Sequence, residues 1–571
     1  SLTYTFIYWY TCDYSQSRTA DRMKEYPYLQ VRFGLNRVPT QQHLSYIKRN
    51  KFPAEYRSFL KKLGAEIRSQ ALEYNITSKE IGKPDVNPGE VSEESDMSVE
   101  KYVDKHIPDL IHKLTKCIGE TFDTGRSHNT VHSDEVVWEH QYMMSLNDRS
   151  GTGAAHRTRR KHVSNDMHGD THTRAVKKLG TPDGYELSLE GLSESEIPEW
   201  RAISNTIKNP FHNAIDVMLD QVQDDDLFTE PAVVAIDTTD DQFYSVPYKS
   251  DDETEPDDEP IVVNDSGKTK VPKEDYPEMV EGGEESGKYQ YTYATLTTVG
   301  TNEPITLGVE PVRHHSTWER GEGMSVAWGE IVDNLMQQAR QHIDIHFVMA
   351  DKAFENKAVS HVLEHEHDVN YLMPKEEDAD WVEEDIEAIE EDPTIDCRVV
   401  RGSSVDIEGK TPYIDGDSDP AVDANGHSHD QTVMYVPPRN DEWAIDIDGE
   451  KVGVFVTNRS DVNPDDALGV TQRYSKRWDI ENEYKMIKPL LPSIASTDYR
   501  MRFFSFAFSC LLYNMWRVID HEAKMMAIDE VKGYDRGPHE DRLDTILPLD
   551  DFMDTTLIEF AKNWLDPPDL H

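Results

Sequence analysis

The sequence predicts an α/β fold in which helices flank a mixed sheet, with a β-rich insertion and a mainly α-helical N-terminal region. Three observations predict it. Residues 1–215 lack the alternating apolar pattern of strands and contain helical candidates. From residue 231, short apolar runs and amphipathic stretches follow one another as three strands, helix, strand, helix and strand. After a long acidic run, four more short strands precede a final helical region.

The N-terminal region has one clear helical candidate, Pro53–Tyr74, where apolar residues recur at helical spacing and the proline suits a first position. Residues 44–74 and 157–178 are locally basic, each with seven Lys or Arg, against three and two acidic residues respectively. In so acidic a chain, these stretches are either contacts for phosphate or ordinary solvated faces. The histidines of the second stretch match no metal-ligand spacing.

Two apolar strands of the predicted sheet carry an aspartate at their ends. "PAVVAID" ends in Asp237 and "IDIHFVMAD" ends in Asp351. Between them, "KYQYTYATLTTVG" and "EPITLGVEPV" predict two strands of an antiparallel meander, and 324–341 predicts a helix. A helix near 353–367 and the strand "VNYLMP" follow. Because a residue that closes such a strand emerges at the carboxyl edge of the sheet, the two aspartates are expected at one edge.

Two acidic runs interrupt this unit. Residues 251–259 carry seven acids in nine positions and open a loop at 250–288, and residues 376–392 carry eleven acids in seventeen. Both are expected to be solvated insertions. Beyond the second run, "DCRVVRG", "QTVMYVPP", "EWAIDI" and "KVGVFVTN" predict the strands of a β-rich insertion, with the last strand rejoining the parent sheet.

Composition sets bounds on the class of protein. The 571 residues include 59 Lys and Arg against 109 Asp and Glu, a formal charge of −50. Because the acids are spread along the chain, we interpret them as adaptation to a salt-loaded cytoplasm, a background like that of a halophilic archaeon. At molar salt the Debye length is only about 3 Å, so close contacts, and not the net charge, decide whether DNA binds.

Other classes of protein are not expected. The four cysteines lie far apart and form no C-x-x-C pair, so neither a disulfide framework nor a thiolate zinc site is predicted. The richest apolar stretch, 503–516, is too short to span a bilayer. No membrane partner is expected, and with no secretory signal visible we expect a cytoplasmic protein.

The stretch "RYSKRWDIENEYKMIK", residues 473–488, predicts a helix whose cations stand out in an acidic chain. Winding it at about 100° per residue places one set of side chains on a single stripe and turns Glu483 away from it. The stripe is either part of a site or an exposed helix with ordinary i, i+4 ion pairs. Its members are Tyr474, Arg477, Glu481, Tyr484 and Lys488.

Three carboxylates, Asp237, Asp351 and Glu481, would then form a triad. Converging carboxylates repel one another, so they either take up protons or bind divalent cations. Ligands that are all oxygen suit Mg²⁺ or Mn²⁺. Two such ions about 4 Å apart can activate a water or hydroxyl and stabilise the oxygen that leaves phosphorus. This arrangement is typical of phosphodiester chemistry.

The spacing Tyr474-(2)-Arg477-(3)-Glu481-(6)-Lys488 resembles the Y-R-E-K signature of bacterial and archaeal insertion-sequence transposases of the DDE class. "VVAIDTT" and "VMADKAF" are similar to the first-aspartate and second-aspartate strands of that family, and the stretch from residue 496 is similar to its closing helix. The resemblance covers about residues 230–520. It implies an RNase H-like fold, a β-rich insertion before the glutamate, and DNA cleavage followed by strand transfer.

The resemblance also implies roles for single residues. Asp237, Asp351 and Glu481 would hold two Mg²⁺ or Mn²⁺ ions and be catalytic. Arg477 and Lys488 would contact the DNA backbone near the cut, and Tyr474 would position a phosphate at the transposon end. Trp443, in the insertion, either stacks on an unpaired base or belongs to the core of a small β domain.

The function that follows is cleavage and strand transfer at the ends of the protein's own insertion sequence. The partners would be terminal inverted repeats and target DNA, with a homodimer in the active complex. Two alternatives remain: a catalytically defective or domesticated DNA-binding protein of the same fold, and a stand-alone metal-dependent nuclease. The expected domains are an N-terminal DNA-end-binding region, the first part of the catalytic core, an acidic linker with the β-rich insertion, the second part of the core with the glutamate helix, and a C-terminal tail: 1–215, 216–375, 376–451, 452–525 and 526–571.

Overall fold

The structure is a computed structural model of the chain. Apart from isolated residues and short runs before residue 68, at 155 and at 227–228, it describes the following ranges. They are 2–11, 99–127, 129–146, 167–182, 200–220, 231–245, 280–282, 287–300, 302–312, 324–375, 398–407, 427–436, 444–447, 450–462, 464–474, 477–530 and 545–565.

The chain divides into two compact units, of which the first comprises Ser1–Tyr102 and Lys524–Thr545. This unit contains α1 (Leu2–Thr11), whose buried Phe6 and Trp9 pack with ring centroids 5.0 Å apart. A small apolar core forms where these rings meet Leu44, Ile47 and Leu60. Most of the helix predicted at 53–74 lies outside the described residues.

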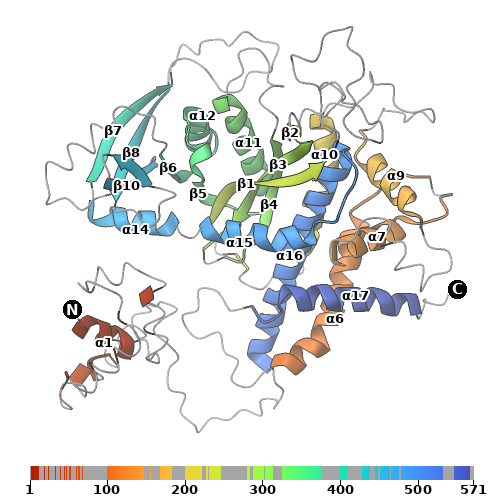
Figure 1. Ribbon diagram of the computed structural model, residues 1–571, viewed down its shortest axis with the longest axis horizontal. Helices are drawn as coiled ribbons and strands as arrows, with labels where there is room; N and C mark the ends of the chain where they lie inside the picture. The colour runs from red at the N-terminus through yellow and green to blue at the C-terminus, as the bar shows by residue number, and fades with distance from the viewer. Residues whose placement is uncertain are drawn as a thin grey trace. The chain divides into compact units, whose positions relative to one another are not determined.

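The second unit, Val103–Ala523 with Ile546–His571, is built on a mixed sheet (Figure 1). Its first strands form the predicted antiparallel meander, and β5 then pairs parallel with β1, as β6 does with β5. The predicted mixed α/β architecture is confirmed, with a strand order of β4-β3-β1-β5-β6. The strands are β1 (Ala232–Tyr244), β3 (Lys288–Thr298), β4 (Thr306–Val312), β5 (Ile345–Ala350) and β6 (Asn370–Pro374).

Helices connect these strands in the predicted order. α11 (Met324–Ala339) lies between β4 and β5, and packs so closely on β4 that a Cβ at Gly308 would lie 3.0 Å from the Leu335 side chain. Glycine therefore permits this contact. Between β5 and β6 the chain forms three short helical segments: η6 (Lys352–Phe354), α12 (Lys357–His361) and the π-helical η7 (Val362–Glu366).

The prediction that the first apolar strand ends at Asp237 is wrong, because β1 continues to Tyr244. Beyond Asp237 it pairs with β3 only, since its parallel pairing with β5 ends at Ile236. Cross-strand contacts stabilise this polar half: Asp240 accepts a hydrogen bond from Thr292, and the Phe243 ring stacks on Tyr289. β2 (Val280–Gly282) pairs with the same end of β3.

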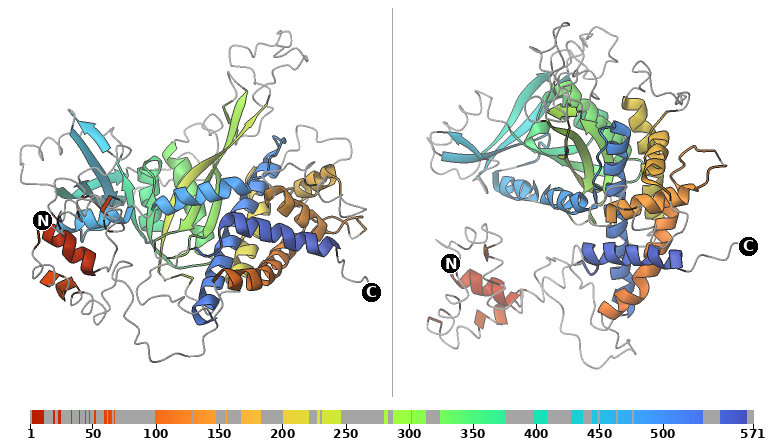
Figure 2. Two further views of the ribbon diagram at one scale, coloured as in Figure 1. Left: turned by 60° about the horizontal axis from the view of Figure 1, so that its bottom comes forward. Right: turned by 45° about the vertical axis from the view of Figure 1, so that its right-hand side comes forward.

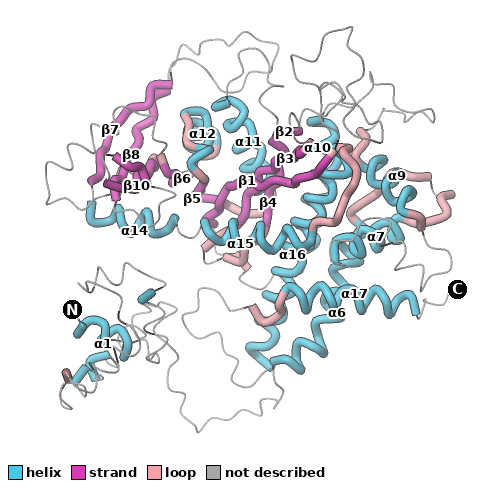
Figure 3. The backbone as a smooth tube through the Cα atoms, in the orientation of Figure 1, coloured by secondary structure: helices cyan, strands magenta, loops and turns pink. Residues whose placement is uncertain are grey.

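The β-rich insertion extends the parent sheet. Phe455 and Val456 of β10 pair antiparallel with β6, so the last strand rejoins the sheet as predicted. Figure 3 shows the strands running from β7 at one end to β2 and β3 at the other. On the far side of β10 the order continues to β8 and β7, with β9 beside β10. The bounds are β7 (Arg398–Ile407), β8 (His427–Val436), β9 (Ala444–Ile447) and β10 (Glu450–Thr457).

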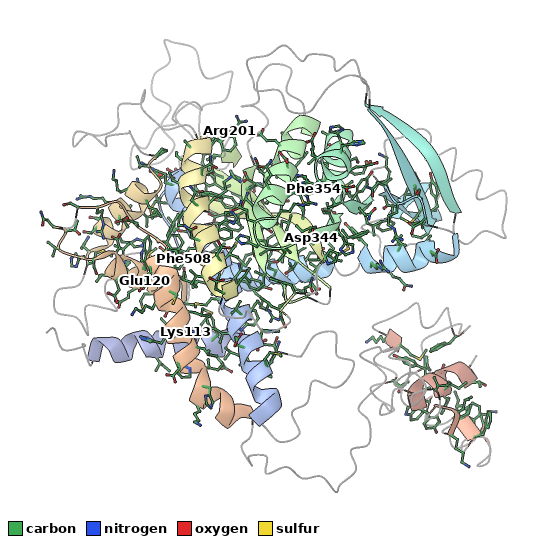
Figure 4. The ribbon with its side chains drawn as sticks, turned by 180° about the vertical axis from the view of Figure 1, so that it is seen from behind. Lys113, Glu120, Arg201, Asp344, Phe354 and Phe508 are labelled. Atoms are coloured by element: carbon green, nitrogen blue, oxygen red, sulfur yellow. The ribbon has the colours of Figure 1, made fainter. Side chains whose placement is uncertain are left out.

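Within the second unit, the long helix α16 (Tyr499–Glu530) packs beside helices that precede the sheet in the sequence (Figure 2). Its Phe508, labelled in Figure 4, packs against the rings of Phe122 and Tyr142. The ring centroids are 6.0 and 5.1 Å away, respectively. None of the described helices combines the length and the apolar character needed to cross a membrane. The other helices are α6 (Val99–Glu120), α7 (Asp134–Leu146), α9 (Gly169–Leu179), α10 (Trp200–Leu219) and α17 (Leu549–Leu565).

Candidate active site

Two aspartates lie side by side at the carboxyl end of β5. Ile236 pairs with Ala350, so Asp237 and Asp351 are the next residues on adjacent parallel strands, which are spaced about 4.8 Å apart. Each carboxylate accepts a hydrogen bond from the following backbone amide, that of Thr238 or Lys352, at 2.8 Å. The sheet therefore brings together the two acids that the sequence predicted at one edge.

Two described helices cover most of the stretch 473–488, for which a helix was predicted. They are α14 (Pro464–Tyr474) and α15 (Trp478–Ile487), and residues 475 and 476 lie outside the described residues. Arg477 precedes α15 with helical dihedrals, φ −59° and ψ −25°, and Glu481 lies in the first turn. The relative phase of Arg477 and Glu481 is thus that of one helix. Figure 1 shows α15 beside β1.

Arg477 joins the third carboxylate to the first. Its Nη1 donates to Asp237 Oδ2 and its Nη2 to Glu481 Oε1, both at 2.6 Å. The arginine is only 4% exposed, and its guanidinium lies 5.3 Å from the centroid of the Tyr474 ring. The (i, i+4) pair between Arg477 and Glu481 is therefore part of a largely buried cluster and not a solvated surface contact.

Two tyrosines of the same stripe hydrogen-bond α14 and α15 to the strands that lead to the aspartates. Tyr474, fully buried, donates its hydroxyl to the carbonyl of Ala350, the residue before Asp351, at 3.1 Å. Tyr484 donates to the carbonyl of Asp237 at 2.8 Å, and its hydroxyl also lies 2.8 Å from that of Thr295 on β3. The phosphate-positioning role of Tyr474 stays a prediction, and in this structure its hydroxyl is bonded to the backbone.

The electrostatics of Asp237 reflect this crowding. The pKa of its carboxyl is raised to about 6, because burial and, to a smaller extent, the charges of Asp351 and Glu481 raise it more than Arg477 and the Thr238 amide lower it. A like-charge contribution from both other acids places all three carboxylates in one electrostatic neighbourhood. The site thus has the charge concentration expected of a cation-binding centre.

The donor set suits a hard divalent ion, because all three side chains offer carboxylate oxygens. The described residues nevertheless contain no group of three or more His, Cys, Asp or Glu side chains arranged to hold a metal ion. Asp237 and Glu481 instead bond the guanidinium of Arg477. The three carboxylates therefore suit Mg²⁺ or Mn²⁺ by donor type. In this structure the positive group beside two of them, Asp237 and Glu481, is the guanidinium of Arg477.

The remaining predicted residues differ in their surroundings. Lys488 is exposed at the C-terminal end of α15, where its amide caps the carbonyl of Tyr484. Glu483 points away from the stripe, as predicted, and is 1% exposed against the hydroxyl of Thr306. Trp443 lies outside the described residues, as do 157–166 of the second basic stretch. In the described part of that stretch, Lys177 pairs with Asp498 at 2.9 Å.

Sequence reasoning missed two features of this site. Tyr484 was placed on the stripe without a role, although its position three residues after Glu481 put it on the correct face. The bridge from Arg477 to Asp237 was also missed, because helical spacing gives the face of a side chain but not its partner on another element.

Comparisons with known proteins add little to this geometry. No protein-family model matches the chain, and no curated protein matches it. Among solved structures it is similar to a piggyBac transposase in a cryo-EM synaptic complex with hairpin DNA. The two share 11% identity over 81% of this chain and 80% of that one, with a TM-score of 0.41. A likeness this weak establishes neither a common fold nor a common activity.

Proposed function

We propose that this protein is a DDE-class transposase that cleaves DNA at the ends of its own insertion sequence and transfers the freed strand to target DNA. The observation that carries the proposal is the convergence of Asp237, Asp351 and the helix bearing Glu481 at the carboxyl end of β5. The strand order β4-β3-β1-β5-β6, with β5 and β6 parallel to β1, supports an RNase H-like core. The Y-R-E-K spacing supports the same assignment.

The chain's own residues would act as follows. Asp237, Asp351 and Glu481 would hold two divalent ions, Mg²⁺ or Mn²⁺, which supply activation of the attacking oxygen and charge stabilisation at phosphorus. Tyr474 and Tyr484 orient the strand ends and α15 through their bonds to the backbone. Lys488, exposed about 10 Å along the helix from Glu481, can contact a DNA phosphate beside the cut.

Labelled element ends with Mg²⁺ and high KCl test this proposal. Joined products, in which the labelled 3′ end is linked to target DNA, would support transposition. Nicks without end preference would instead indicate a stand-alone nuclease, and bound but uncut DNA a defective or domesticated binding protein. Because two ends must be joined in concert, we expect two protomers in the active complex, which light scattering of the protein bound to paired ends would measure.

A further inference from the structure

The guanidinium of Arg477 is bonded to the same two carboxylates that the proposed function assigns to metal ions. One Asp237 oxygen and one Glu481 oxygen each accept a 2.6 Å bond from a different nitrogen of its fork. These are charge-assisted bonds inside a nearly buried cluster, so they are stronger than surface ion pairs. Each bond takes up a lone pair on one oxygen of its carboxylate, and the positive charge of the guanidinium repels a second cation that approaches the same carboxylate.

Arg477 supplies the positive charge that this pocket needs in the absence of another cation. A buried carboxylate without a partner is strongly destabilising, and Asp237 is 9% exposed with two other acids beside it. One cation between Asp237 and Glu481 removes that penalty. Either a guanidinium or a divalent ion meets the requirement.

The pairing leaves one donor of Arg477 without use. Its Nε is buried and has no hydrogen-bond partner among the described residues. A buried donor without an acceptor is unfavourable, so the guanidinium is not fully satisfied in this position. Its planar fork also matches the oxygens of a phosphate, which offers it an alternative acceptor once it leaves the carboxylates.

We propose that Arg477 and a divalent cation compete for Asp237 and Glu481, so that the site loads metal only when the guanidinium releases these carboxylates. This inference rests on the proposed function, because it takes the two acids to be metal ligands. The released arginine becomes the DNA-backbone contact that the family resemblance implies. Metal loading and phosphate binding are thereby coupled through one side chain.

Mn²⁺ binding to the full chain without DNA tests the competition, with free Mn²⁺ measured by electron paramagnetic resonance in high KCl. Arg477→Lys keeps the positive charge but cannot reproduce the two-bond fork, whereas Arg477→Gln removes the charge as well. We expect both variants to bind Mn²⁺ about tenfold more tightly than the unaltered protein. Arg459→Lys is the matched control. Arg459 donates two bonds to a single carboxylate, that of Asp461, on the surface and away from the site, so this variant should bind Mn²⁺ as the unaltered protein does.

The outcomes separate this inference from the proposed function. If Arg477→Lys binds Mn²⁺ no more tightly than the unaltered protein, the guanidinium fork does not hold the carboxylates against the cation, and the inference is wrong. Weaker binding in both variants would mean that Arg477 supports the metal site. If adding Asp237→Asn to Arg477→Lys leaves Mn²⁺ binding as tight as in Arg477→Lys alone, the carboxylates are not metal ligands and the proposed function itself fails. Circular dichroism verifies that each variant folds. If Arg477→Gln does not fold, comparing the Mn²⁺ affinities of Arg477→Lys and Arg459→Lys still tests the inference.

Discussion

Two glutamates of α15 lie in opposite environments although only two positions separate them. The side chain of Glu481 is 31% exposed and bonds Arg477, whereas Glu483 is buried and bonds the hydroxyl of Thr306. Because successive residues on a helix point about 100° apart, a step of two turns the side chain to the other side. The sequence predicts this difference from helical phase alone, and the pair offers a matched test of the site.

Glu481→Gln should reduce cleavage of labelled element ends by about a hundredfold or more, since it removes a charge from the reacting centre. Glu483→Gln should leave the cleavage rate within a few-fold, because the amide oxygen can still accept the bond from Thr306. Gel-shift binding of the same DNA should persist in both variants. Equal losses of cleavage would contradict the helical phase described for α15.

The buried carboxyl of Glu483 should also give stability a measurable pH dependence. Burial raises its pKa from 4.5 to about 8, so between these values the unfolded chain ionises while the folded chain keeps its proton. The folded state then binds more protons, and the free energy of unfolding falls as pH rises, by at most about 1.4 kcal/mol per pH unit from this group. Denaturant unfolding at pH 5 and pH 8 should show this loss in the unaltered protein and a smaller one in Glu483→Gln. A loss of the same size in both proteins would contradict it.

At the scale of elements, the sequence predicts the strands and helices whose stability depends on residues close together in the chain. Runs of Val and Ile predict the order of the strands, and "KVGVFVTN" predicts a strand that rejoins the sheet, as β10 does. The polar continuation of β1 after Asp237 was not predicted, because its stability comes from β3, about fifty residues away along the chain. Residues 475 and 476 lie outside the described residues, so the continuity of the helix predicted at 473–488 stays a prediction.

Helix α10 is anchored to the sheet by a buried ion pair. Lys208 Nζ lies 2.5 Å from Glu310 Oε1 on β4, and the side chain of Glu310 is 2% exposed. Removing one partner of such a pair leaves a buried charge, so Lys208→Ala should lower the free energy of unfolding by about 3 kcal/mol. Arg201→Ala, on the same helix, breaks an exposed pair with Glu330 and should lower it by less than about 1 kcal/mol.

Denaturant unfolding monitored by circular dichroism compares these two variants. The double variant Lys208→Met with Glu310→Met should recover most of the loss, because an apolar pair needs no charge compensation. If Lys208→Ala and Arg201→Ala lose equal stability, the Lys208 pair contributes no more than a surface contact, and another interaction must hold α10 on β4.

At the scale of the whole molecule, the net charge of −50 opposes both folding and DNA binding in dilute salt. The described arginines and lysines of the second unit repeatedly pair with acids, as Arg502 does with Asp241 and Arg517 with Glu303. Such pairs neutralise charge locally but leave the excess of acids along the chain. Dissolved salt must therefore screen the repulsion among the excess acidic side chains.

Raising KCl from about 0.1 M to about 1 M shortens the Debye length from about 10 Å to about 3 Å, so repulsion between distant acids nearly vanishes. The midpoint of thermal unfolding should rise across this range, because the compact state suffers this repulsion more than the expanded chain does. Differential scanning calorimetry measures the midpoint, and sucrose at matched osmolality, which does not screen charge, should raise it less. A midpoint that stays constant or falls with KCl would mean that the acids are not adapted to salt, and the net charge would then count against a DNA partner.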